Sequence, residues 1–255
     1  MTWNLILQSF SILRRDRQLI LFPVLSALAA IAVSIPFLLA LFAGASVHLD
    51  RWTPMHYALT FLWYSACAFV IVFFNCALAA CAQIRFSGGE PTLGAGIAVA
   101  GSKTANILLW AIVSSTVGVA LRAISDRVGL IGKIVVAICG GAWSLVTYLI
   151  VPVLVLEDRD VIDSIRRSGQ LLRDTWGEQL VAGLHFGWIG LALAIPGIVL
   201  AVLAWPVAIL YFVLLAAVLT AARQVFVVAL YRFATTGQAP SGYSPDALHG
   251  AFRPR

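Results

Sequence analysis

Four carboxylates, Glu157, Asp158, Asp160 and Asp163, cluster directly after a long apolar stretch. Clustered carboxylates can hold a divalent cation, because hard cations prefer oxygen ligands. Acidic residues at the start of a helix also cap its free N–H groups and complement its dipole. An amphipathic pattern begins just after Asp160, so we interpret the acids as a helix cap and predict neither a metal site nor a cofactor.

Enzymatic chemistry has few other candidates. His185 lies inside an apolar stretch, and with Glu157 and Asp160 it forms the set of polar groups that a lipid-modifying site would need. The sequence has no phosphate-binding glycine loop and no HExxH or GxSxG motif. We therefore expect no catalytic residues, and an enzyme stays an open alternative. The cysteines lack the spacing of a metal site or a disulfide framework: Cys67, Cys76, Cys81 and Cys139.

Apolar residues dominate the composition. Hydrophobic residues make up 61% of the chain and charged residues 11%, against about 45–50% and about 25% in soluble domains. Too few charges remain to cover a water-soluble surface, whereas lipid solvates an apolar one. The formal charge of +6 does not indicate nucleic-acid binding, because the cations lie between apolar stretches. The composition predicts an all-α polytopic transmembrane bundle.

Six stretches reach the length of about 20 apolar residues that a transmembrane helix needs. They cover residues 19–45, 57–84, 107–123, 130–156, 180–203 and 206–231. The first is too long for the core of a cleavable signal peptide, so we interpret it as an uncleaved span. We predict one membrane domain over residues 1–234 and a flexible cytoplasmic tail, rich in glycine, serine and proline, over residues 235–255.

The distribution of lysine and arginine predicts the orientation, since cytoplasmic loops carry the excess. One side of a six-span arrangement has four cations, Arg51, Arg122, Arg127 and Lys133. We therefore expect a multi-pass protein of the cell (cytoplasmic) membrane with both termini in the cytoplasm. The other side has thirteen cations: Arg14, Arg15, Arg17, Arg85, Lys103, Arg159, Arg166, Arg167, Arg173, Arg223, Arg232, Arg253 and Arg255.

Two amphipathic segments flank the apolar stretches. In residues 2–16 the apolar side chains recur at offsets of three and four, which indicates a helix lying in the membrane surface. Residues 160–176 show a similar periodicity, with acids first and bases last. Both segments carry side chains that can contact anionic lipid headgroups or a protein partner. These candidates are Arg14, Arg15, Arg17, Arg166, Arg167, Arg173 and Trp176.

Small residues and prolines mark places where helices can pack closely or bend. Gly183 and Gly187 form a GxxxG pair, which is typical of close helix contacts in membranes. Pro152, and Pro196 with Gly197, can kink their helices and free backbone carbonyls. Such kinks either serve packing, which we favour, or line a substrate site as in transporters.

The same segments suggest an internal repeat. Ser9-Phe-Ser-Ile-Leu-Arg-Arg-Asp is similar to Ser168-Gly-Gln-Leu-Leu-Arg-Asp-Thr, and each precedes an apolar stretch. Residues 95–106 occupy the corresponding place before the third stretch, although Gly94, Gly96 and Gly101 weaken this segment as a helix. We predict three units, each a surface helix followed by a transmembrane hairpin.

Four sequence segments together resemble a known family. They are Trp3 and Ser9 followed by Leu19-Ile-Leu-Phe-Pro-Val-Leu-Ser, the Val151-Pro-Val-Leu-Val-Leu-Glu157 exit, Ser168 with Leu172 and Trp176-Gly177, and the Tyr231-Arg-Phe ending. Nearly the whole chain is similar to an uncharacterised family of prokaryotic six-span integral membrane proteins, a domain of unknown function. Residues 157–176 more weakly resemble the membrane domain attached to some glycerophosphodiester phosphodiesterases. Neither resemblance implies catalytic residues here.

Three functions stay open at this point. The leading hypothesis is a non-enzymatic membrane scaffold, or a protein that binds anionic lipids or a protein partner through its basic helices. The first alternative is a transporter or channel for a neutral or lipid-like solute, and the second is a lipid-modifying membrane enzyme. The first four apolar stretches have no ionisable group near their centres, which disfavours a proton-coupled transporter. The sequence determines neither a partner nor whether the chain forms a homo-oligomer.

Overall fold

The computed structural model describes residues 2–43, 54–175 and 182–244. Every regular element in these ranges is an α-helix, which confirms the predicted all-α class. In chain order the helices of the described residues are α1 (Thr2–Arg15), α2 (Gln18–Ala43), α3 (Pro54–Phe86), α4 (Leu93–Ser102), α5 (Thr104–Ser125), α6 (Leu130–Val146), α7 (Ile150–Leu156), α8 (Val161–Thr175), α9 (Ala182–Leu203) and α10 (Trp205–Thr236).

Five helical segments of the described residues are long and apolar enough to cross a membrane. They are α2, α3, α5, the α6–α7 pair and α10, and each coincides with a predicted apolar stretch. Helix α5 has 22 residues and is about 33 Å long. It is therefore longer than the third predicted stretch, residues 107–123. The part of α9 from Gly187 to Ala201 is apolar as well but shorter.

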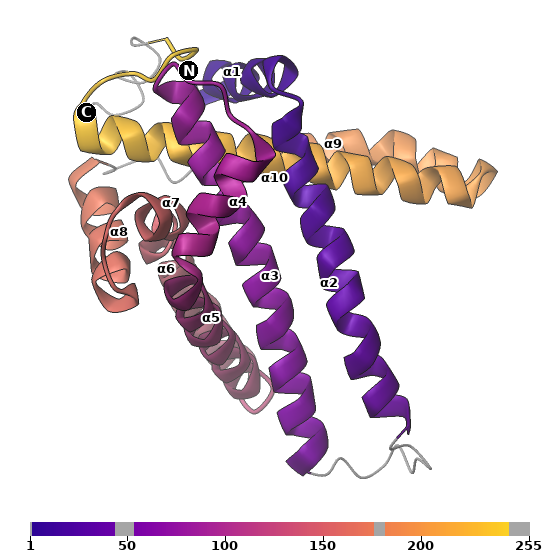
Figure 1. The fold of residues 1–255 in the computed structure, drawn as a ribbon. Helices are drawn as coiled ribbons and strands as arrows, with labels where there is room; N and C mark the ends of the chain where they lie inside the picture. Colours follow the sequence, from indigo (N-terminus) through magenta and orange to yellow (C-terminus); the bar gives the residue numbers. More distant parts are fainter. Residues whose placement is uncertain (1, 44–53, 176–181, 245–255) are drawn as a thin grey trace.

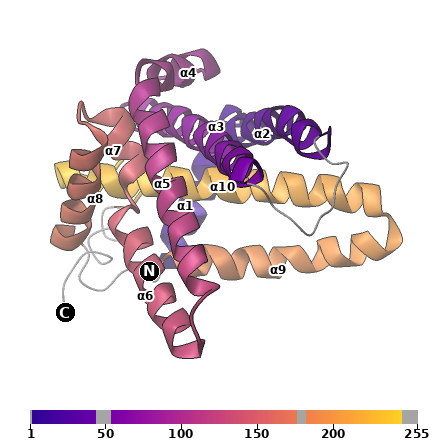
Figure 2. The same ribbon diagram turned by 90° about the horizontal axis from the view of Figure 1, so that it is seen from below.

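The long helices run in two directions (Figures 1 and 2). Helices α2, α3, α5 and α6 extend lengthwise from one end of the molecule, and α1 and the end of α10 lie at that end. Helices α9 and α10 form a hairpin joined at Ala204, which runs crosswise to the others in both views. Most of the described part of each predicted stretch is therefore helical, but the last two stretches do not lie parallel to the other four.

Small residues in α10 account for this crossing. Ala217, Ala221, Ala222 and Ala229 are buried residues of α10, which packs against α1, α2 and α3. Because a small side chain lets helices approach closely, α10 can pass these helices at short range. Hydropathy carries no information about the direction of a helix, so the sequence could not predict the crossing.

The buried core lies at one end of the bundle. It joins α1, the first turns of α2, the second half of α3, α7 and the second half of α10. Leu19, Phe22 and Phe226 are among its fully enclosed side chains. Farther along the long helices, large apolar side chains such as Leu28 and Ile35 are exposed, as expected for a surface solvated by lipid.

The element order follows the predicted repeat. A short helix precedes two long ones three times: α1 before α2 and α3, α4 before α5 and α6, and α8 before α9 and α10. The three units are not equivalent in space, because the third hairpin runs crosswise (Figure 1). In the second unit, the second long segment is divided into α6 and α7.

The fourth apolar stretch is interrupted. Helix α6 ends at Val146 and α7 begins at Ile150, and a turn between two helices leaves backbone groups without helical partners. The N–H of Leu149 donates to the Ser168 Oγ atom of α8 at 3.1 Å. Pro152 lies in the first turn of α7, where a missing N–H breaks no helical hydrogen bond. Ser168 of the amphipathic helix α8 thus supplies a hydrogen-bond acceptor to the turn that interrupts the apolar stretch.

The first residues of the predicted flexible tail are ordered. Helix α10 ends at a C-cap glycine, Gly237, whose φ of 69° lies in the left-handed region. Tyr243 is buried, with its hydroxyl 2.6 Å from the Ser9 Oγ atom of α1 and its ring edge-on to Phe86. The chain after α10 therefore fastens α1 to the end of α3. Residues 245–255 of the predicted tail lie outside the described residues.

We expect Tyr243→Phe to lower the free energy of unfolding by about 1 kcal/mol at neutral pH, because it removes the hydroxyl that pairs with Ser9. Burial raises the pKa of the Tyr243 phenol, and the hydrogen bond with Ser9 opposes this by a smaller amount. The stabilisation is complete below the unfolded-state pKa of about 10 and is lost as the pH rises toward the folded-state pKa. Thermal midpoints in detergent should therefore converge for the two proteins above about pH 10. A difference that stays constant with pH would contradict this.

Candidate functional site

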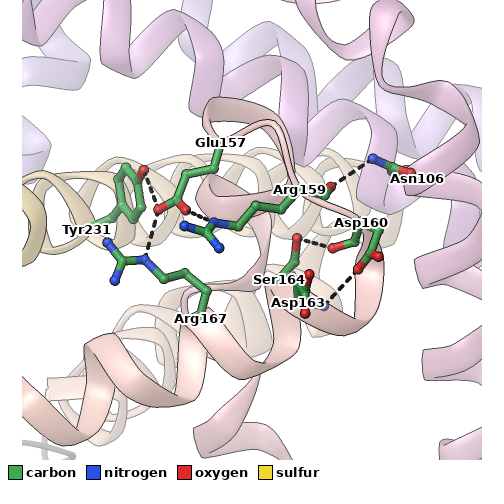
Figure 3. Close-up of polar contacts among 8 residues, drawn as sticks. All are labelled: Asn106, Glu157, Arg159, Asp160, Asp163, Ser164, Arg167 and Tyr231. Atoms are coloured by element: carbon green, nitrogen blue, oxygen red, sulfur yellow. Dashed lines mark hydrogen bonds and ion pairs between the residues drawn. The ribbon is translucent and has the colours of Figure 1, made fainter.

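The carboxylate of Glu157 is the centre of a polar cluster at the end of α7 (Figure 3). Its Oε2 atom lies 2.5 Å from the Arg159 Nε atom, and its Oε1 atom lies 3.3 Å from the Arg167 Nε atom. The hydroxyl of Tyr231, on α10, donates to the same Oε1 atom at 3.0 Å. The Glu157 side chain is only 15% exposed. One carboxylate therefore joins α7, α8 and α10.

Two neighbouring acids act at the start of α8. Asp160 caps the helix, and Asp158 pairs with Lys103, which directly precedes α5. The N–H of Asp163 donates to the Asp160 Oδ1 atom at 2.9 Å, so Asp160 is the N-cap of α8. Asp158 lies 2.6 Å from the Lys103 Nζ atom, and the hydrogen bond and charge of that ammonium group lower the pKa of the Asp158 carboxyl. The side chain of Asn106 donates to the Arg159 carbonyl at 3.0 Å.

This geometry favours a structural function for the acidic cluster. No three histidine, cysteine or acidic side chains of the described residues are grouped so that they could hold a metal ion. Glu157 already accepts hydrogen bonds from Arg159, Arg167 and Tyr231, so both of its oxygens are engaged by other side chains of the protein. The side chain of His185, the third residue considered for a lipid-modifying site, lies outside the described residues.

Two of the candidate arginines line a groove at the same end of the molecule. The groove lies between α1, α2 and α10 and has a volume of about 680 Å³. Arg14 and Arg17 are exposed side chains in its lining. The other lining residues are apolar apart from one serine: Leu7, Phe10, Ser11, Leu13, Ile20, Leu21 and Val218. The groove thus combines apolar walls with two guanidinium groups.

The other candidate contacts do not join this groove. Arg15 is exposed on α1 but does not line it. On α8, Arg167 pairs with Glu157, Arg166 lies 3.4 Å from the Asp163 carboxylate, and Arg173 is exposed. Trp176 lies outside the described residues. Of the seven candidates, Arg14 and Arg17 line the groove, Arg166 and Arg167 form ion pairs, Arg15 and Arg173 are exposed outside the groove, and Trp176 is not described.

The candidate packing residues meet aromatic side chains or open space. At Gly197, a Cβ atom would lie 2.6 Å from the ring of Phe212 and 2.8 Å from that of Tyr211. The hydroxyl of Tyr211 donates to the carbonyl of Leu193, close to Pro196. The segment around Pro196 and Gly197 is thus packed against aromatic side chains of α10. A Cβ atom at Gly187 would meet no atom within 4 Å, so its face of α9 is not packed against the described part of the chain. The side chain position of Gly183 lies outside the described residues.

Several residues that organise the site carry no signal in the sequence pattern. Tyr231 and Ser168 carry the family resemblance, but helical periodicity gives them no role. In the structure Tyr231 donates to Glu157, and Ser168 accepts from the Leu149 N–H in the interrupted stretch. Asp16 lies next to the groove arginines in sequence, but its carboxylate lies 2.8 Å from the Arg85 Nε atom at the end of α3. These partners are distant in sequence, so helical periodicity cannot reveal them.

The fold and the site together define a class: a multi-pass α-helical membrane protein in which two amphipathic helices, α1 and α8, accompany five segments long and apolar enough to cross a membrane. Residues 54–243 match the model of a family of unknown function, DUF6159, and the chain belongs to that family. The match excludes α1 and α2, which contribute most of the groove. No curated protein and no solved structure matches the chain, so the weaker resemblance to a phosphodiesterase-associated domain gains no support.

Proposed function

We propose that this protein is a non-enzymatic membrane protein that binds an anionic lipid in the groove between α1, α2 and α10. The observation that carries the proposal is the pairing of an apolar trough with two exposed guanidinium groups, Arg14 and Arg17. A lipid has the matching chemistry, because its acyl chains need apolar walls and its phosphate accepts hydrogen bonds from guanidinium groups.

The charges near the groove support an anionic headgroup. The one carboxylate between Arg14 and Arg17 in sequence, that of Asp16, is paired with Arg85 and so does not neutralise them. Neither Arg14 nor Arg17 forms an ion pair within the described part of the chain. Near an anionic membrane surface each such base contributes about 1 kcal/mol to binding.

The groove end of the molecule is the end that we propose to face the cytoplasm. It carries α1, the end of α3 and the end of α10, all on the side with the excess of arginine and lysine. The crosswise hairpin does not affect this inference. Helices α9 and α10 are joined at one residue, so both ends of the hairpin lie on the same side whether or not it spans the bilayer. Four lengthwise spans then place both termini together.

The test removes the two groove charges and keeps the total charge matched to a control. We expect Arg14→Gln with Arg17→Gln to weaken binding of dioleoylphosphatidylglycerol to the purified protein by about 30-fold, the equivalent of about 2 kcal/mol. The control, Arg15→Gln with Arg173→Gln, removes two exposed arginines outside the groove and should change affinity less than about threefold. Lipid titration followed by native mass spectrometry gives both affinities. Equal losses in the two variants would show diffuse attraction to the surface and overturn the proposal.

A further inference from the structure

A second cavity lies where α10 crosses α2 and α3. Its volume is about 320 Å³, and it lies among helices long and apolar enough to span the membrane. Most of its lining is apolar: Pro23, Val24, Ala27, Ala30, Ile71, Val213, Ala216 and Ala217. Three polar side chains complete it, namely Ser26 on α2, Asn75 on α3 and Thr220 on α10.

The polar groups of this cavity lack partners. Within the residues that the structure describes, the side chains of Ser26, Asn75 and Thr220 form no hydrogen bond. Other hydroxyls on the same helices bond a backbone carbonyl, as Ser34 does to Ala30 at 2.7 Å. Unsatisfied polar groups are costly in lipid, where no water can replace the missing partner. Three of them around one cavity indicate a ligand with polar atoms of its own.

The ligand must be uncharged. No acidic or basic side chain lines the cavity, and an ion placed among apolar walls without a counter-charge pays a large desolvation penalty. The three side chains offer one amide and two hydroxyls, which can both donate to ester carbonyls and accept from a hydroxyl. This chemistry differs from that of the α1–α2 groove, where guanidinium groups select an anion.

We propose that this cavity binds the glycerol and ester region of a neutral glycerolipid of the diacylglycerol type. One free hydroxyl and two ester carbonyls match the amide and the two hydroxyls in number and polarity. The acyl chains would continue along the exposed apolar face of α2, where Leu28 and Ile31 are open to lipid. The cavity volume of about 320 Å³ lies at the lower end of the range of about 300–1,000 Å³ for small-molecule pockets, so we assign the polar region to the cavity and the acyl chains to the lipid-facing surface. The inference stands independently of the anionic-lipid groove.

The experiment titrates dioleoylglycerol into the purified full-length protein in a neutral detergent and counts bound lipid by native mass spectrometry. We expect the triple variant Ser26→Ala, Asn75→Leu, Thr220→Val to bind at least about tenfold more weakly, because each lost hydrogen bond contributes a factor of about 2 to 10. Its binding of dioleoylphosphatidylglycerol should stay within about twofold of the wild type. Loss of the anionic lipid with retention of dioleoylglycerol would overturn the proposal.

A matched control makes the same chemical changes elsewhere. Ser144→Ala with Thr116→Val removes exposed hydroxyls that bond their own helices, Ser144 to Gly140 and Thr116 to Ile112. This control should bind dioleoylglycerol as the wild type does, and equal weakening in both variants would overturn the site. A second variant, Ala216→Phe, fills the cavity without touching its polar groups and should also abolish binding. Unchanged dioleoylglycerol binding in Ala216→Phe would place the lipid elsewhere.

Discussion

Replacing Gly96 by valine is expected to lower the free energy of unfolding by about 3 kcal/mol, because it forces apart α4 and α3. A Cβ atom at Gly96 would lie 2.6 Å from the Cys81 Sγ atom, 2.7 Å from the Ala77 carbonyl oxygen and 2.9 Å from the Phe22 ring. The carbonyl oxygen belongs to a helix backbone, and Phe22 is fully enclosed in the core. Neither can move aside without disturbing several helices.

Two other glycines of α4 supply the control. At Gly94 and Gly101 a Cβ atom would meet nothing within 4 Å, so valine there changes only the helix propensity, by less than about 1 kcal/mol. Thermal midpoints in one detergent, followed by tryptophan fluorescence, compare the three variants. Similar midpoints for the Gly94 and Gly96 variants would mean that α4 does not pack as closely as the structure shows.

The same helix shows what the sequence could and could not predict. Its glycines looked like helix-weakening residues, and by propensity alone they are. At Gly96 glycine stabilises the fold, because only a residue without a side chain lets α4 pack directly against the backbone of α3. Thr92 caps the helix through a 3.2 Å bond from the Ala95 N–H, which further offsets the low propensity.

Helix positions were predictable because hydropathy and amphipathic periodicity are local. The bounds of α1 and α8, Thr2–Arg15 and Val161–Thr175, fall within one or two residues of the predicted segments. The five long apolar segments overlap five of the six predicted stretches, and the remaining stretch overlaps α9, whose apolar part is shorter. Such patterns report which segments enter lipid, since that depends on a segment's own composition.

The arrangement of those helices depends on contacts between residues far apart in the chain. The crossing of α10 over α2 and α3, the bond between Tyr243 and Ser9, and the groove beside Arg14 are all long-range. Likewise, Arg14 and Arg167 looked equivalent as basic residues of amphipathic helices. In the structure one lines an open groove and the other is bound to a carboxylate, because only one of them has an acid from another element within reach.

The second large effect is expected at this carboxylate, that of Glu157. We expect Glu157→Ala to lower the free energy of unfolding by about 2 kcal/mol, because it leaves the guanidinium groups of Arg159 and Arg167 and the hydroxyl of Tyr231 without their acceptor. The arginine side chains are 45% and 32% exposed, so water recovers part of the loss and the full cost of breaking a buried ion pair does not apply. Glu157→Gln should retain a fraction of the stability through its remaining carbonyl oxygen.

The loss should be concentrated in α8, since Glu157 joins this helix to α7 and α10. We expect faster hydrogen exchange in Val161–Thr175 and at Leu149, whose N–H depends on Ser168 of the same helix. Asp163→Ala removes a longer ion pair between exposed side chains, with Arg166 at 3.4 Å, and should cost less than about 1 kcal/mol. If both variants accelerate exchange equally, the Glu157 cluster is no more than a surface ion pair. Faster exchange confined to α8 and Leu149 in the Glu157 variant instead identifies the cluster as the contact that holds the basic helix against the long apolar helices.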